Sequence, residues 1–341
     1  MPHIAILGSG ANGAGIACDL VDAGHDVTII EQWPENVAAL REHGIRVDLP
    51  DGTRATAPIR ALNLSDVATL RGERFDVVLV VMKAYDTRWA CQLIEPYLAP
   101  DGIAVGLQNG MTVDIMSDVF GPHRTLGAVI EIAAAMWEPG LVERHTGPAG
   151  TWFAVGSLSD ATVGRETEIT DILRHAGTAV AVDDIRSAKW MKLVVNAAEL
   201  VTSAIVDLPL LSAARLPGMH DFMLKTGKEA IHVAVASGRS VVPIFGLTDV
   251  DPANPDGFVE SMLDAVYTQW SLPKTKTTVL QDWQKGRRGE VDQLNGYVVE
   301  IGAQVGVPTP ANQRTVEIAH LIESGEIAGS PDNLQRLITG I

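Results

Sequence analysis

A glycine-rich turn between a strand and a helix constrains this chain more than any other feature. Residues 3–7 form a short apolar run, and Gly8-Ser9-Gly10-Ala11-Asn12-Gly13 follows it directly. Residues 14–21 have helical composition, and residues 25–30 form a second β-rich run that ends at Glu31. This order, within about 30 residues, is typical of a dinucleotide-binding βαβ unit. The matching context on both sides disfavours the alternative, an ordinary tight turn.

Each glycine of the turn has a mechanical reason in such a unit. Gly8 permits the tight turn, Gly10 lets a pyrophosphate approach the backbone, and Gly13 lets the helix sit close to the strand. The N–H groups at the helix start would then hold the phosphate charge. We therefore expect residues Gly8 to Gly13, with Ser9, Ala11 and Asn12 among them, to contact a dinucleotide.

Glu31 indicates which dinucleotide, NAD(H) or NADP(H), the chain binds. A carboxylate at the end of the second strand accepts hydrogen bonds from the ribose hydroxyls of NAD and repels a 2′-phosphate. No arginine or lysine follows before Arg41. The sequence favours NAD(H), with NADP(H) possible; the alternative is that Glu31 is a solvated strand end.

Charge and composition narrow the classes of partner. The chain has 341 residues, of which 46% are hydrophobic and 20% charged, as in a globular protein of about two domains. With a net charge of −16 and one short basic cluster at residues 285–288, nucleic acids and anionic membranes are poor partners. We expect a small-molecule substrate.

The cysteines and the N-terminus point to a cytoplasmic protein. Cys18 and Cys91 form no disulfide framework and are expected to be reduced core residues. The first strand begins at residue 3, which leaves no room for a signal peptide, and no apolar run approaches membrane-spanning length. No cluster of residues has the spacing of metal ligands.

Strands and helices alternate in the first half of the chain. Beyond the βαβ unit, the expected elements are helices at 36–43, 87–98 and 167–176, a hairpin at 45–59, strands at 76–82, 103–107 and 178–182, and antiparallel strands at 126–137 and 141–145 that complete the sheet. This pattern predicts a Rossmann-type doubly wound sheet. Lys83 and Asn109 follow strand ends, as do Gly8 and Glu31, and ligands bind at that edge.

The second half has helical periodicity throughout. Helices are expected at 188–206, 218–237, 262–267, 277–285 and 291–305, with a long loop at 241–257. The division falls near residue 185. We expect a dinucleotide-binding domain at 1–185 and an all-helical substrate and dimerisation domain at 186–341.

Lys192 and Asn196 share one face of the helix expected at 188–206, because they are four residues apart. A lysine on such a face, beside apolar residues, could donate a proton to a carbonyl oxygen and stabilise the developing alkoxide. The alternative is a solvated lysine whose stem lies along the helix.

Several segments together resemble the ketopantoate reductase family. They are residues 8–13, 40–44, 83–85, 108–111, 189–198, 281–282, 286–287, 290–292 and 294–296. The resemblance implies a Rossmann domain followed by a helical domain like that of 6-phosphogluconate dehydrogenase. It also implies NADPH-dependent reduction of a 2-keto acid, and we expect a homodimer.

Site residues follow from the same resemblance. Lys192 matches the family's general acid and Asn196 its neighbouring substrate asparagine, whereas Glu290 matches an acidic residue near the ribose and substrate. Further matches are Asn109, at the position that touches nicotinamide and substrate; Lys83, the lysine after the fourth strand and the rival proton donor; and Thr277 or Thr278, where the family binds the substrate carboxylate.

Two positions depart from the family pattern. Leu200 stands where a second asparagine is usual, and Glu31 opposes the usual NADPH preference. Both departures favour a relative with the family's mechanism and a less polar substrate than ketopantoate, acting as a reductase or as an alcohol dehydrogenase. The competing interpretations are an opine or β-hydroxy acid dehydrogenase and a non-catalytic NAD(H)-sensing protein.

Overall fold

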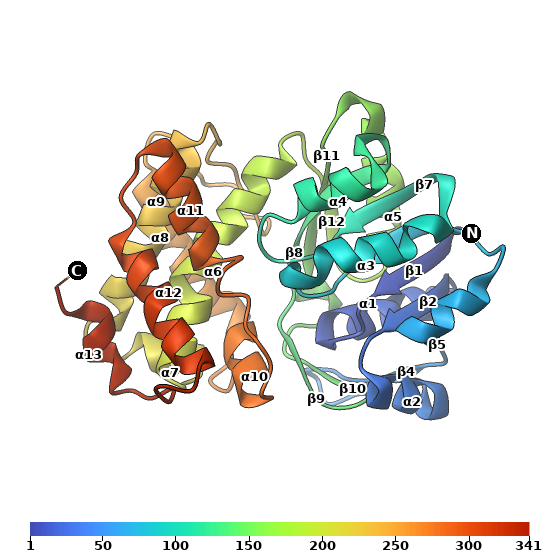
Figure 1. The fold of residues 1–341 in the computed structure, drawn as a ribbon, viewed down its shortest axis with the longest axis horizontal. Coiled ribbons are helices and arrows are strands. Elements are labelled where there is room, and N and C mark those ends of the chain that lie inside the picture. Colours follow the sequence, from blue (N-terminus) through green and yellow to red (C-terminus); the bar gives the residue numbers. More distant parts are fainter. Residues whose placement is uncertain (341) are drawn as a thin grey trace. The chain divides into compact units, whose positions relative to one another are not determined.

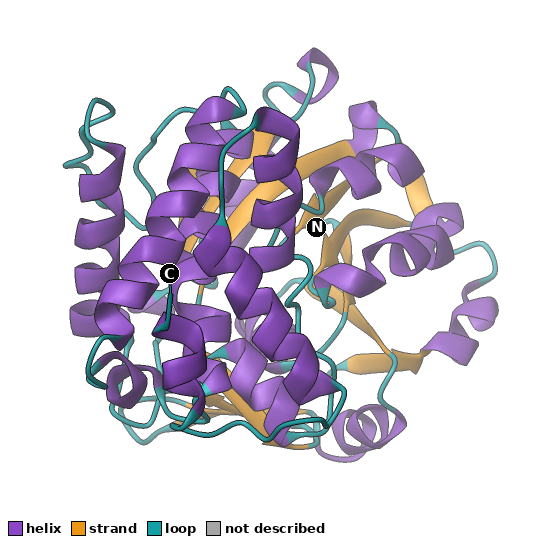
Figure 2. Ribbon diagram, turned by 60° about the vertical axis from the view of Figure 1, so that its left-hand side comes forward, coloured by secondary structure: helices purple, strands orange, loops and turns teal. Residues whose placement is uncertain are grey.

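A computed structural model describes residues 1–340 of the chain. Contacts within the chain divide it into two compact units, Met1–Ile185 and Arg186–Ile341, called unit 1 and unit 2 below. Unit 1 contains two sheets and the helices packed on them, whereas residues 186–340 of unit 2 form helices and loops (Figures 1 and 2). The prediction of a doubly wound α/β domain followed by a helical domain is confirmed.

The larger sheet of unit 1 has eight strands in the order β12-β11-β8-β7-β6-β1-β2-β5. All neighbouring pairs are parallel except β8 and β11. The strands are β1 (His3–Leu7), β2 (Asp26–Glu31), β5 (Arg60–Asn63), β6 (Phe75–Val80), β7 (Leu98–Gly106), β8 (Thr125–Glu131), β11 (Trp152–Ser157) and β12 (Thr178–Ala181).

Alternate residues of the central strands face two separate cores. Ile4 and Ile6 of β1 pack in one core with helices α1 (Ala11–Asp22) and α5 (Glu166–Leu173). Ala5 and Leu7 pack in the other, with α3 (Thr87–Ile94) and α4 (Val113–Phe120). Helices therefore cover both faces of the sheet, as the apolar runs of its strands require.

The smaller sheet corrects one prediction. The expected antiparallel strands of residues 126–145 do not all complete the main sheet, because only β8 joins it. β9 (Ala134–Glu138) and β10 (Leu141–Arg144) instead pair with the hairpin of β3 (Ile45–Asp48) and β4 (Arg54–Ala57), in the order β4-β3-β10-β9. Val47, Met136 and Val142 of this sheet share the core of α1, so that α1 is covered on two sides. Helix α2 (Pro34–His43) follows β2.

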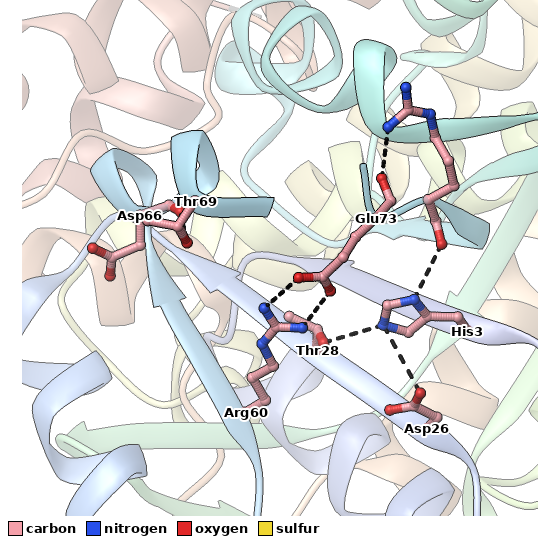
Figure 3. A network of polar contacts seen from close by, with 8 residues as sticks. His3, Asp26, Thr28, Arg60, Asp66, Thr69 and Glu73 are labelled. Atoms are coloured by element: carbon pink, nitrogen blue, oxygen red, sulfur yellow. Dashed lines mark hydrogen bonds and ion pairs between the residues drawn. The ribbon is translucent and has the colours of Figure 1, made fainter. Parts of the chain in front are cut away.

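A polar network lies where strands of the main sheet begin (Figure 3). Arg60 donates to both carboxylate oxygens of Glu73 at 2.6 and 3.0 Å. The ring of His3 lies 3.1 Å from the Arg74 carbonyl and 4.0 Å from the Asp26 carboxylate. These contacts fix the edge opposite to the strand ends that carry the glycine turn.

Unit 2 follows the first residue of α6 (Ile185–Ile205), which is the last residue of unit 1. The other helices are α7 (Leu210–Ala214), α8 (Met219–Ala236), α9 (Pro255–Ala265), α10 (Thr278–Gln284), α11 (Asn295–Val305), α12 (Pro310–Glu323) and α13 (Asn333–Ile338). α9 begins earlier and α11 later than the periodicity predicts. Val291 and Leu294 are buried although they precede α11, so their apolar spacing reflects a packed turn rather than a helix. None of the helices within residues 1–340 is both long and apolar enough to cross a membrane.

Arg144 joins the small sheet to α1 through an ion pair with the partly buried Asp19. Its side chain is fully buried, and its Nη1 lies 2.6 Å from Oδ2 of Asp19. Nε donates to the Thr146 carbonyl and Nη2 to the Thr151 hydroxyl, at 3.1 and 2.7 Å. Burial raises the pKa of Asp19, and the neighbouring guanidinium opposes that rise. The carboxylate therefore depends on Arg144 for its charge.

We predict that Arg144→Met lowers the free energy of unfolding by up to about 3–5 kcal/mol, because it leaves the largely buried charge of Asp19 without its cation. Urea unfolding measures this value. Adding Asp19→Asn should recover part of the loss. Arg54→Met is the matched control, since Arg54 pairs with Asp48 at the surface, and it should have little effect. Equal losses for the two arginine variants would contradict the prediction.

Candidate functional site

The glycine turn of unit 1 is shaped as the sequence predicts. Gly8 has a φ of +91°, and a Cβ on Gly13 would lie 2.0 Å from the Gly8 carbonyl oxygen. Neither position accepts a side chain. A Cβ on Gly10 would meet nothing within 4 Å, so the backbone there is open to a ligand. α1 begins at Ala11 with no acidic residue in its first turn. The turn and the helix start therefore fit a dinucleotide pyrophosphate.

Glu31 lies beside this turn and is hydrogen-bonded to it. Its Oε2 accepts from the backbone N–H of Ser9 at 2.6 Å and from the Ser9 hydroxyl at 2.9 Å. Its Oε1 accepts from the N–H of Trp33 at 2.9 Å. The buried amide of Asn36 donates to the Ser9 carbonyl and hydroxyl and accepts from Gly140. Glu31 thus shapes the turn, a role that its position in the sequence did not predict.

Lys83 and Asn109 follow β6 and β7, and β6 lies between β7 and β1 in the parallel sheet. The parallel order brings the carboxyl ends of β7, β6, β1 and β2 to one edge, with Asn109, Lys83, Gly8 and Glu31 after or at them. The buried Gln108 amide donates to the Met82 carbonyl and the Thr87 hydroxyl, at 2.8 and 2.9 Å. Gln108 therefore ties together the two loops that carry Lys83 and Asn109.

In unit 2, Lys192 and Asn196 lie one turn apart on α6. Asn196 is buried and Lys192 is partly exposed. Nζ of Lys192 lies 4.7 Å from the centroid of the Phe245 ring, within the range of a cation–π contact. Leu200, on the next turn of the same face, is buried too. The face thus combines a lysine, an amide and apolar walls.

Lys189 is a second lysine on α6 and was not expected. It is 3% exposed, and its burial lowers its pKa to about 8. Its position one turn before Lys192 makes it the nearest rival to Lys192 for a role in proton transfer. Lysines are usually exposed, so the sequence gives no sign that Lys189 is buried, and only the structure shows it.

The two candidate threonines differ in their hydrogen bonds. The Thr277 hydroxyl is buried, donates to the Leu200 carbonyl at 3.0 Å and lies 3.3 Å from the Ser203 hydroxyl. Among residues 1–340, the buried Thr278 hydroxyl has no hydrogen-bond partner. Thr278 therefore has the hydroxyl better suited to a ligand. Glu290 is buried in the turn before α11, and its carbonyl accepts from Gln293 and Leu294.

The described part of the chain, residues 1–340, contains no group of three or more His, Cys, Asp or Glu side chains suited to a metal ion.

Comparison with known proteins assigns the family. The model of the family "Ketopantoate reductase PanE/ApbA" matches residues 4–157, and that of its C-terminal part matches residues 184–323. A 2-dehydropantoate 2-reductase of Archaeoglobus fulgidus is 27% identical over 95% of this chain and 98% of its own length. One of Mesorhizobium japonicum is 28% identical over 90% of this chain and 93% of its own.

Solved structures have the same fold. A PanE/ApbA family ketopantoate reductase from Ralstonia eutropha JMP134 superposes with a TM-score of 0.79, 27% identity, and coverage of 95% of this chain and 99% of its own. A D-mandelate dehydrogenase, in a ternary structure with NADH and anilino(oxo)acetate, gives a TM-score of 0.83 at 22% identity, covering 95% of this chain and 98% of its own. The family models cover both units, and the chain therefore belongs to the ketopantoate reductase family of oxidoreductases.

Proposed function

We propose that the protein interconverts a 2-keto acid and the corresponding 2-hydroxy acid, with NAD(H) as its preferred cofactor. The observation that carries the proposal is the α6 face, where Lys192 stands one turn from the buried amide of Asn196. Unit 1 adds a glycine turn that fits a pyrophosphate. Membership of the family supports an oxidoreductase activity. The proposed substrate class, a 2-keto acid, is that of the relatives named 2-dehydropantoate 2-reductase.

The proposed roles follow from the chemistry of carbonyl reduction. Residues Gly8 to Gly13 hold the pyrophosphate, while Lys83 and Asn109 position the nicotinamide end. NADH, when bound, supplies the hydride that reaches the carbonyl carbon. Lys192 gives its proton to the carbonyl oxygen and becomes neutral, which completes the hydroxyl group. In oxidation the neutral amine takes that proton back. Asn196 orients the carbonyl, Thr278 binds the carboxylate, and Glu290 aids substrate binding.

The proposed substrate is less polar than ketopantoate. Leu200 presents an alkyl group where the family usually has an amide, and it is 7% exposed. Burying a substrate hydroxyl against it, without a partner, would cost about 1–3 kcal/mol. The D-mandelate dehydrogenase bound to NADH offers a precedent in this fold for NADH with a 2-hydroxy acid. A Staphylococcus aureus ketopantoate reductase described as dimeric supports the proposal of a homodimer.

We predict a higher kcat/KM with NADH than with NADPH, because the Glu31 charge would face the 2′-phosphate. Two like charges about 6 Å apart, at an effective dielectric constant of about 40, repel by about 1.4 kcal/mol, or tenfold. Glu31→Gln should therefore raise the NADPH/NADH ratio about tenfold, while its carbonyl oxygen can still accept from Ser9. Steady-state kinetics with both cofactors measures the ratio. A wild-type preference for NADPH would refute the assignment.

We predict that Lys192→Met lowers kcat by about 10²–10⁴-fold, as expected when a proton donor is lost, with little change in NADH affinity. Single-turnover reduction and fluorescence titration of NADH measure the two quantities. Lys225→Met, an exposed lysine on α8, is the matched control and should leave kcat unchanged. If Lys192→Met retains wild-type kcat while Lys83→Met abolishes turnover, the roles are reversed.

Lys189 should affect the stability of the fold in a pH-dependent way, and this effect distinguishes it from Lys192. Because its pKa is about 8 in the folded chain and ordinarily 10.5, the unfolded chain binds more protons between these values. Burial of this lysine therefore destabilises the fold fully below pH 8, and the penalty disappears as the pH rises to 10.5. Lys189→Met should therefore raise the free energy of unfolding, relative to wild type, more at pH 7 than at pH 10.5. The gain over wild type, from urea unfolding, should vanish near pH 10.5; a pH-independent gain would contradict this origin.

A further inference from the structure

Phe245 lies in the long loop between α8 and α9, yet it is buried like a core residue. Its side chain is 6% exposed. The ring makes an edge-on contact with Trp270, with centroids 5.3 Å apart and planes at 69°. Trp270 ends the short helical segment Val266–Trp270 that continues α9. A residue of an irregular loop is thus held in a fixed orientation by a second aromatic ring.

The backbone of Phe245 is in the left-handed region. Its φ is +60°, and Gly246 follows with a φ of +78°. A bulky aromatic residue rarely adopts a positive φ, because its Cβ crowds the backbone, and such residues cluster at ligand clamps. The surrounding contacts must therefore hold the ring where it is. The ring also contacts Lys192, whose Nζ lies 4.7 Å from the ring centroid.

This contact places Phe245 beside the reacting carbonyl. A carbonyl oxygen that takes a proton from Lys192 lies about 3 Å from Nζ. The carbonyl carbon is about 1.2 Å further, and its two substituents start about 1.5 Å beyond it. These lengths are short enough for the substituent on the Phe245 side to reach the ring. The carboxylate needs hydrogen-bond donors, which a phenyl ring lacks, so the side chain of the keto acid is the group that fits there.

We propose that Phe245 is a specificity-determining residue that selects 2-keto acids with an aromatic side chain; this rests on the proposed function. Phe245 and Leu200 offer no hydrogen-bond partner, which disfavours a polar side chain. Phe245 and Trp270 already form an edge-on aromatic pair, and a third ring can add to such a pair in offset or edge-on geometry. Such packing favours an aromatic group over a branched alkyl group of similar size.

The test compares reduction of phenylpyruvate and phenylglyoxylate with that of 4-methyl-2-oxopentanoate and 3-methyl-2-oxobutanoate, with NADH as reductant. The wild type should have a higher kcat/KM for the aromatic pair. Phe245→Leu keeps an apolar side chain without a π face, and it should lower the aromatic-to-alkyl ratio about 3- to 10-fold. Phe245→Tyr should retain the ratio. The loss should appear in KM more than in kcat, because the ring contacts the part of the substrate that does not react.

Phe258→Leu is the matched control. Phe258 lies on α9 in the same unit and is 5% exposed, so the substitution makes the same chemical change at similar burial. It should leave the ratio unchanged. Three outcomes would overturn this inference and leave the proposed function intact. They are an unchanged ratio in Phe245→Leu, an equal fall of the ratio in Phe258→Leu, and a wild-type preference for the alkyl acids. Failure of the wild type to reduce any 2-keto acid would overturn the proposed function and this inference together.

Discussion

The close approach of α1 to β1 is the constraint on which unit 1 depends. A Cβ at Gly13 would lie 2.0 Å from the Gly8 carbonyl, so any side chain would push the helix away from the strand. α1 is covered by the main sheet on one side and by the small sheet on the other. Its buried positions are accordingly mostly small, among them Ala14, Gly15 and Ala17. Displacing α1 would separate both sheets and would also move the helix start that we propose binds the pyrophosphate.

Local patterns predicted those parts of the fold that depend on neighbours in sequence. The strand, glycine turn and helix at the N-terminus, the strand at residues 75–80 and the helix of Lys192 all follow from periodicity or composition. These patterns did not predict which strands pair with β9 and β10. β9 and β10 are apolar enough for either sheet, and their place depends on contacts such as that of Arg144 with Asp19, 125 residues apart. No local rule contains such a contact.

The site shows the same limit. The pair Lys192 and Asn196 could be predicted, because four-residue spacing places two side chains on one helix face. Asn36 could not, since its amide reaches Ser9 and Gly140 across long stretches of chain. Phe245 was seen only as part of a loop, because an irregular backbone has no period from which burial can be read. Its aromatic identity, beside a following glycine in a long loop, is the one signal that could have marked it.

A buried network in unit 2 explains why α6 can present Lys192 in a defined place. The amide of Asn295 donates to the Ala197 carbonyl of α6 and to Asn312, whose own amide donates to the Glu229 carboxylate. That carboxylate also accepts the N–H groups of Ala311 and Asn312 at the start of α12. Four helices are thereby joined next to Asn196 by groups that cannot be solvated. The candidate residues Lys192, Asn196 and Leu200 lie on α6, to which this network is hydrogen-bonded through the Ala197 carbonyl.

The proposed role of Glu31 in cofactor choice is physically coupled to the geometry of the glycine turn. Its carboxylate holds the Ser9 N–H and hydroxyl, and Ser9 is in turn held by Asn36. Replacing the charge alone would remove the proposed repulsion toward a 2′-phosphate, but it would also weaken the hydrogen bonds that shape the glycine turn. An arginine, which has no acceptor atom, would lose them all. A full change of preference therefore requires a second change at Ser9 or Asn36, so that the turn keeps its conformation when the carboxylate is gone.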